Sequence, residues 1–220
     1  MLVGQPTLRC HTQSTTGHHY RDGIHEPADH RGSVLLSIAR ATLEERLLDR
    51  HGCEVGSDAT LPDWLHDHAA TFVTLFLETR LRGCVGSLEA VRPLYEDVRR
   101  NAIAAALEDT RFPPVEAAEL AGLTLEVTLL SAREPLHCRS ERDALDQLRP
   151  GVDGLVLTYG SRRATFLPQV WDSIPRASTF LEALKEKAGL ERDFWHRSIL
   201  IERYTALSWS ELDGRAVSDA

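Results

Sequence analysis

Two spacings of hydrophobic residues alternate along this chain, one typical of helices and one typical of strands. From Ser33 to Leu48 the apolar positions recur at helical spacing, and Gly52 supplies a stop, so the pattern predicts a helix with one buried face. A second helix is predicted to open at Pro93 and to run to Leu107, because proline fits the first turn of a helix and the alanines before Leu107 allow close packing.

Strand patterns occupy the stretches between and after these helices. Residues Ala70–Leu77 are rich in β-branched and aromatic types, and a short turn at Glu78–Arg80 leads into Leu81–Leu88, which predicts a hairpin. Leu123–Leu129 alternates apolar and polar positions, as expected of a strand with one buried face.

The C-terminal third repeats the same mixture. A second hairpin is predicted from Gly154–Tyr159 and Ala164–Leu167. Ser178 is expected to cap a helix that continues to Ala188, and a single last strand is expected near Ile199–Trp209.

This order of elements lacks the regular strand–helix–strand alternation of a doubly wound fold. It favours an α+β fold with antiparallel or mixed sheets and flanking helices. A length of 220 residues suits one domain built of two lobes or, equally, two small domains. We expect a flexible, His-rich leader over residues 1–30, the folded domain over 31–211 and a polar tail over 212–220.

Composition narrows the classes of function. The 42% hydrophobic and 26% charged residues are typical of a globular protein, and the net charge of −8 disfavours a nucleic-acid partner. No apolar run approaches the roughly 18 residues of a membrane span, and no secretory signal opens the chain, so no membrane partner and a cytoplasmic location are expected. The four cysteines form no C-x-x-C pair, which suits reduced thiols.

Metal and cofactor signals are weak. The leader holds five histidines at irregular spacing, and the His66–His68 pair would converge only on a strand, so no metal ligand is assigned. The chain carries no phosphate-binding glycine loop, nucleotide fingerprint or cysteine trio for an iron–sulfur cluster, and no cofactor is predicted.

The segment Leu81–Ser87, reading LRGCVGS, is the leading candidate for function. Two glycines within four residues of a strand, Gly83 and Gly86, indicate a bulge or the close approach of another group. Cys84 is a candidate nucleophile or redox thiol, with Arg82 or Arg111 stabilising its thiolate and Glu89 transferring a proton. The alternative is a small cysteine that only packs in the core.

A second candidate lies where the helix ending near Leu107 gives way to two prolines. Arg111 follows Asp109 and precedes Phe112, and its guanidinium is placed to grip a carboxylate or phosphate. The alternative is a structural salt bridge with Asp109 that locks the turn.

These segments together resemble a known family. LRGCVGSLEAVRPLYEDVRRNA, DTRFPPV, LTLEVTLLSAREPL, GVDGLVLTYGSRRATFLPQVW and KAGLERDFW follow, in order and spacing, the pattern of the AMMECR domain family, the A component of the AmmeMemoRadiSam system. The resemblance covers roughly residues 31–211.

The resemblance implies an α+β fold in two lobes with the LRGC-type segment as a proposed site, and a family without an established activity. It implies a Memo-like protein and a radical SAM enzyme as partners, and thus an accessory or binding component. An enzyme using Cys84 and a purely structural adaptor are the competing hypotheses.

Lys185 stands where many relatives have a cysteine, so a mechanism with a second thiol there is in doubt. The residues carried over are Arg82, Gly83, Cys84, Gly86, Glu89, Asp109, Arg111 and Phe112.

Overall fold

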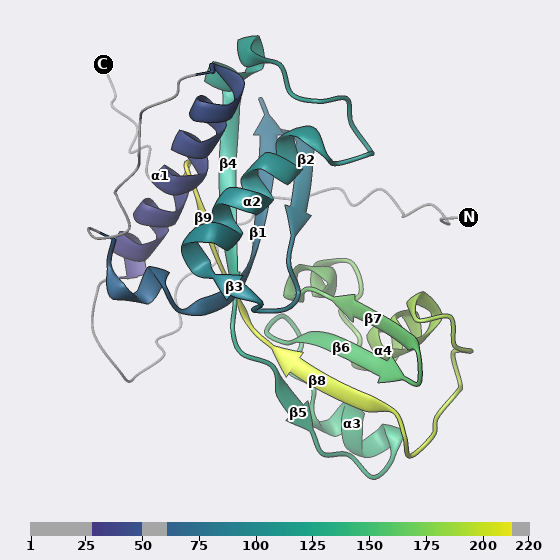
Figure 1. The fold of residues 1–220 in the computed structure, drawn as a ribbon. Helices are drawn as coiled ribbons and strands as arrows, with labels where there is room; N and C mark the ends of the chain where they lie inside the picture. The colour runs from purple at the N-terminus through teal and green to yellow at the C-terminus, as the bar shows by residue number, and fades with distance from the viewer. Residues whose placement is uncertain (1–27, 50–60, 213–220) are drawn as a thin grey trace, which may run out of the picture.

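The computed structural model describes residues 28–49 and 61–212, which form two lobes, each with its own antiparallel sheet (Figure 1). Its helices are α1 (Ala28–Leu47), α2 (Leu94–Leu107), α3 (Glu141–Gln147) and α4 (Ala177–Lys187). Its strands are β1 (His68–Leu77), β2 (Arg80–Gly86), β3 (Arg92–Pro93), β4 (Leu123–Leu130), β5 (Glu134–Leu136), β6 (Gly154–Tyr159), β7 (Arg162–Phe166), β8 (Leu200–Tyr204) and β9 (Ala206–Ser210). Short 3-10 turns cover Asp63–Leu65, Ala117–Gly122 and Pro168–Asp172. The α+β fold with antiparallel sheets and flanking helices is therefore confirmed.

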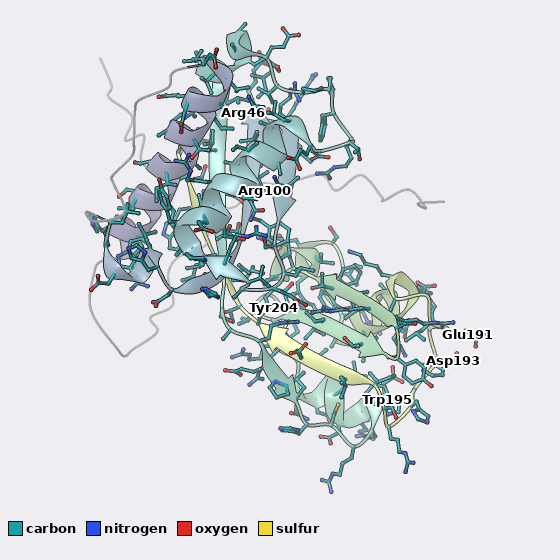
Figure 2. All side chains as sticks on the ribbon, viewed as in Figure 1. Arg46, Arg100, Glu191, Asp193, Trp195 and Tyr204 are labelled. Atoms are coloured by element: carbon teal, nitrogen blue, oxygen red, sulfur yellow. The ribbon has the colours of Figure 1, made fainter. Side chains whose placement is uncertain are left out.

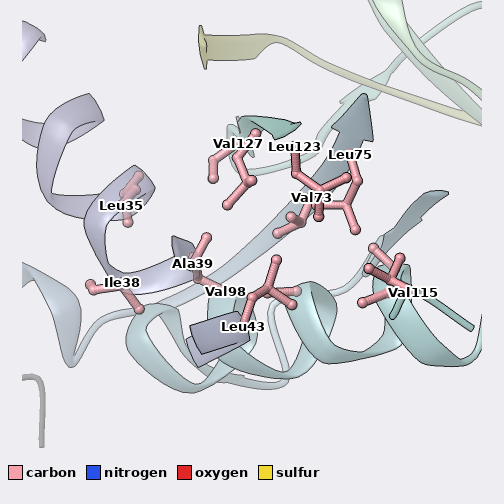
Figure 3. Packing of buried hydrophobic residues seen from close by; sticks show 14 of the residues in the cluster. Leu35, Ile38, Ala39, Leu43, Val73, Leu75, Val98, Val115, Leu123 and Val127 are labelled. Carbon is pink, nitrogen blue, oxygen red and sulfur yellow. The ribbon is translucent and has the colours of Figure 1, made fainter. Parts of the chain in front are cut away.

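The first lobe is a sheet in the order β2-β1-β4-β9, with β3 paired to β1, and α1 and α2 cover one of its faces (Figure 1). Alternate residues of β1 and β4 meet the two helices there. Leu35 of α1, Val98 of α2 and Leu75 of β1 belong to this core, shown in Figure 3, and all three are inaccessible to solvent. Burial of each such side chain contributes about 1.5–3 kcal/mol before the cost of ordering the chain.

The second lobe is a sheet in the order β5-β8-β6-β7 that packs on α3 and α4. Trp171 and Phe180 stack at 3.7 Å between ring centroids in its core. Lys185 of α4 is also fully buried, and its Nζ donates a hydrogen bond to Oε1 of Glu141 at 2.7 Å. This ion pair joins α3 to α4.

A small apolar cluster joins the two lobes. Ala70 and Leu130 from the first sheet meet Val156 and Tyr204 from the second, and Figure 2 places Tyr204 at this junction. The chain crosses between the lobes before β5 and after β8, and Ser131 and Thr205 at these crossings are hydrogen-bonded to each other.

The expectation of one last strand over Ile199–Trp209 is wrong. Tyr204 ends β8 opposite Gly154 in the second sheet, whereas Ala206 begins β9 opposite Leu130 in the first. The stretch from Ile199 to Trp209 contains no glycine, proline, asparagine or aspartate that would mark a break, so the sequence does not report the change of sheet at Thr205.

Other boundaries differ by a few residues. Helix α1 begins at Ala28, inside the expected leader, and α4 begins at Ala177 with Arg176 as its N-cap, so Ser178 is not the cap. Helix α3 and strand β5 were not predicted, because each is too short to establish a period. The leader histidines before residue 28 lie outside the described residues. No helix within the described ranges has the length and hydrophobicity needed to cross a bilayer.

Candidate functional site

Leu81–Gly86 of the LRGCVGS segment lie in β2, an edge strand of the first sheet. The register with β1 shifts between Leu75, which faces Gly83, and Phe76, which faces Leu81. Arg82 is therefore the extra residue of a bulge, and the bulge changes the alternation that would have placed Arg82 on the same face as Cys84.

Both glycines lie where another group approaches closely. A Cβ added to Gly83 would come within 2.1 Å of the carbonyl oxygen of Ala105 on α2, and one added to Gly86 would come within 2.2 Å of the Phe72 ring. Any side chain at Gly83 would push the strand away from the helix backbone. Neither position has room for a side chain, so both glycines serve the packing of β2 against its neighbours.

The thiol of Cys84 is half-buried beside Thr74 on the neighbouring strand, and Oγ1 of Thr74 donates a hydrogen bond to its Sγ at 3.3 Å. Burial raises the pKa of the Cys84 thiol above its ordinary value. The Thr74 hydroxyl and the charge of Arg111 act in the opposite direction and are outweighed. The thiol is accordingly protonated near neutral pH.

Asp109 and Arg111 grip the backbone of Cys84 from outside the sheet. Oδ2 of Asp109 accepts the N–H of Cys84 at 2.8 Å, and Nη2 of Arg111 donates to the carbonyl of Cys84 at 3.1 Å. The two side chains also pair with each other, with Nε and Nη2 of Arg111 at 2.9 and 2.7 Å from the carboxylate. We call this arrangement the Asp109–Arg111 clip.

The Asp109–Arg111 clip lowers the pKa of Asp109 and leaves the Arg111 side chain partly exposed. The hydrogen bonds of Arg111 lower the pKa of Asp109 to about 2, against the opposing effect of burial. The Asp109 side chain is 7% exposed, whereas that of Arg111 is 47% exposed. Within the described part of the chain, Nη1 of Arg111 has no hydrogen-bond partner, and its guanidinium carbon lies 5.5 Å from the centre of the Phe112 ring.

Arg82 does not serve the thiol. Its Nε and Nη2 form a bidentate pair with Glu119, at 2.8 and 2.9 Å. Its guanidinium also donates to the carbonyls of Pro113 and Pro114. Arg82 thus reaches from β2 to the segment that follows α2. Arg111 reaches in the opposite direction, from that segment to β2.

Glu89 is paired at the boundary between the lobes. Its Oε1 lies 2.5 Å from Nη1 of Arg163 and 3.8 Å from Nη2 of Arg133, both in the second lobe. Those two cations lower the pKa of Glu89. The structure therefore pairs Glu89 with the second lobe and shows no contact with Cys84.

Sequence reasoning missed Asp97, which is completely buried on α2. Its Oδ2 accepts from the backbone N–H and hydroxyl of Thr71 and from the Asn101 amide, and its Oδ1 accepts from the hydroxyl of Ser87 and from Arg92. The network anchors the end of the LRGCVGS segment to α2. The sequence feature that could have indicated this network is an aspartate four residues before an asparagine, both within a helix whose second half is rich in alanine.

The chemical groups beside Cys84 are thus the exposed guanidinium of Arg111, the ionised carboxylate of Asp109, the hydroxyl of Thr74 and the protonated thiol itself. Within the described ranges, no three His, Cys, Asp or Glu side chains gather as a metal-ligand group. No histidine of those ranges is among the groups that shift the pKa of the Cys84 thiol. Cys84 lines neither the hollow beside Arg40 and Glu211 nor the hollow beside Tyr159 and Phe194.

Comparisons with known proteins agree with the sequence pattern. The family model described as AMMECR1 matches residues 36–209. A protein of Methanothermobacter thermautotrophicus is 38% identical over 186 residues, covering 82% of this chain and 94% of that protein. A protein of Thermofilum pendens is 36% identical over 191 residues, covering 80% and 87%.

A solved structure is similar throughout the folded part. The crystal structure of an uncharacterized protein from Pyrococcus horikoshii matches with a TM-score of 0.71 and 32% sequence identity. The match covers 82% of this chain and 91% of that one.

Proposed function

Because the chain belongs to the AMMECR1 family, we propose that it is a binding component that acts with a Memo-like protein and a radical SAM enzyme. Its contact surface is the outer edge of β2 together with the segment from Asp109 to Pro114. The identity of the partners rests on the family resemblance, and the position of the surface rests on the contacts of the clip.

The observation that carries the proposal is the state of the sheet edge at Cys84. An edge strand normally presents unpaired N–H and C=O groups, but both groups of Cys84 are taken by the clip. What faces outward instead is the 47% exposed Arg111 side chain beside Phe112. A rigid arginine next to an aromatic ring is typical of residues that dominate protein interfaces.

The test is association between the purified protein and the Memo-like and radical SAM proteins of the same organism, under native, anaerobic conditions. Arg111→Ala is expected to weaken the complex at least about tenfold, as expected for loss of an interface arginine. Arg139→Ala is the matched control, since that side chain is 99% exposed on the second lobe. Failure to associate, or equal effects of the two substitutions, would contradict the proposal.

The competing function is an enzyme that uses Cys84 as a thiolate nucleophile or redox thiol. The Thr74 hydroxyl and the Arg111 charge favour a thiolate, but burial of the thiol and its raised pKa oppose it. Cys84→Ser separates the two functions: loss of cellular activity with normal partner binding supports the enzyme, and unchanged activity supports the binding component.

A further inference from the structure

The second lobe has a hollow of about 740 Å³ at the end of its sheet. One wall is the turn between β6 and β7, and the other is the segment that follows α4. Its lining residues are Tyr159, Gly160, Ser161, Arg162, Gly189, Leu190, Glu191 and Phe194. The hollow belongs to a different lobe from Cys84 and the Asp109–Arg111 clip. Its lining residues fall within two of the family motifs, GVDGLVLTYGSRRATFLPQVW and KAGLERDFW, for which the sequence by itself indicated no role.

The two walls are fixed in position. Gly160 has a φ of 60° and opens a two-residue hairpin turn, and Gly189 has a φ of 76° and ends α4. Nη1 of Arg162 donates to the carbonyl of Gly189 at 2.5 Å and so joins the turn to the helix end. A Cβ on either glycine would meet no atom within 4 Å, so the space beside both turns is open.

Aromatic rings form one corner of the hollow. The ring centroids of Tyr159 and Phe194 are 5.0 Å apart with an interplanar angle of 62°, and the ring centroid of His196 lies 5.6 Å from that of Tyr159. Rings set at an angle offer faces in two directions. Such faces attract cations, and a planar guanidinium also stacks on them.

Two charged residues line the hollow: Arg162 donates to the Gly189 carbonyl, and the Glu191 carboxylate is the acceptor that remains for a ligand. Glu191 lines the hollow and Asp193 follows it on the outer edge of the second lobe, where Figure 2 labels both. Both are exposed, and neither forms an ion pair with another described residue. The nearby Arg192 is already neutralised by Glu186, with Nε and Oε1 2.9 Å apart.

From this combination we infer that the hollow binds a guanidinium group, with the plane of the guanidinium on the Phe194 ring and its N–H groups toward the Glu191 carboxylate. A guanidinium suits the site better than an ammonium, because it stacks and donates in one plane. Arg162 occupies the opposite wall, and its charge directs the ligand to the Glu191 side. The guanidinium belongs either to an arginine of a peptide or to a small guanidine.

The experiment is a titration followed by NMR, read at the backbone amides of Gly160, Ser161 and Gly189. The probes are agmatine, a blocked Gly-Arg-Gly peptide and the same peptide with citrulline, which has the shape of arginine without its charge. We expect saturable shifts with a Kd on the order of 1 mM for a guanidinium probe and none for citrulline. A tighter fit of the peptide assigns the site to a protein ligand, and a tighter fit of agmatine assigns it to a small guanidine.

One variant tests the role of Glu191, and a second serves as its control. Glu191→Gln changes an exposed side chain, so the lobe stays folded, and it is expected to weaken binding about five- to tenfold. Asp172→Asn makes the same change of charge at an exposed position that does not line the hollow, and is expected to bind normally. Absence of saturable shifts, equal binding of citrulline, or equal weakening by both variants would overturn the inference.

Discussion

The carboxylate of Asp109 accepts the backbone N–H of Cys84 at 2.8 Å, so the clip holds the cysteine of the signature segment through its main chain. Arg111 completes the arrangement by donating to the carbonyl of the same residue. The residues of LRGCVGS thus share one mechanical task, which is to hold β2, α2 and the segment after α2 in a fixed relation. The predictions below test that relation.

Asp109→Asn is expected to lower the free energy of unfolding at pH 7 by about 1–3 kcal/mol, because the ion pair with Arg111 is lost from the clip. Its pH dependence is also specific. The pKa of Asp109 is held at about 2 when folded, below its unfolded value of about 3.9. The carboxylate therefore contributes stability that is complete above pH 4 and is lost as the pH falls toward 2.

The measurement is urea unfolding of wild type and Asp109→Asn across that range. The difference between the two proteins should shrink steadily from pH 4 to pH 2. A difference that stays constant with pH would mean that the charge of Asp109 has no part in holding the strand.

Cys84 is expected to react slowly with an alkylating reagent in the folded protein. Its pKa is raised by burial, so the reactive thiolate is scarce at pH 7.5, and labelling should be at least about tenfold slower than in the unfolded chain. Mass spectrometry resolves Cys84 from the other three cysteines. Thr74→Val should slow labelling further, since it removes a donor that favours the thiolate. Fast native labelling with a depressed pKa would instead support thiol chemistry.

Gly83→Ala is expected to destabilise the protein by about 3 kcal/mol or more, because its Cβ would meet the Ala105 carbonyl at 2.1 Å and the backbone of α2 must shift. Gly122→Ala is the control. Its Cβ meets only the Leu77 side chain, at 3.2 Å, which can move, so the change should stay below about 1 kcal/mol. Chemical unfolding measures the loss of stability in both variants. Equal losses of unfolding free energy would contradict the close approach of Gly83 to the helix backbone.

Lys185 and Glu141 should respond unequally to substitution. Glu141→Ala leaves a buried ammonium without its partner and is expected to cost about 3 kcal/mol of stability. Lys185→Met keeps the apolar volume, and Glu141, whose side chain is 31% exposed, can be solvated, so that variant should be neutral or slightly stabilising. Thermal unfolding of the two variants measures the asymmetry, and a larger loss in Lys185→Met would contradict it.

The longer elements followed from local pattern because their own residues specify them. The β-branched residues of β1, the alanines of α2 and the Gly160 turn between β6 and β7 each carry a period or a turn preference within a few positions. The split of the last strand at Thr205 did not follow, since no turn-forming residue stands between β8 and β9 to mark it.

For the candidate site, too, the sequence showed some features and not others. The two glycines, the thiol of Cys84 and the charges of Asp109 and Arg111 were visible in the sequence as unusual residues at short spacing. Their roles were not visible, because the bulge at Arg82 and the partners of Glu89 depend on contacts with segments remote in the chain. The buried Asp97 network was missed for that reason too.

By itself, then, the sequence determined the α+β class, most of the long elements, the family and the segment of interest, since these depend on periodicity and on residue types that neighbours in the chain share. Only the tertiary structure decided what the segment does mechanically: Gly83 admits a helix backbone, Arg82 holds Glu119, and Cys84 is clasped by Asp109 and Arg111. Those are distances between groups brought together by folding, and no local spacing encodes them.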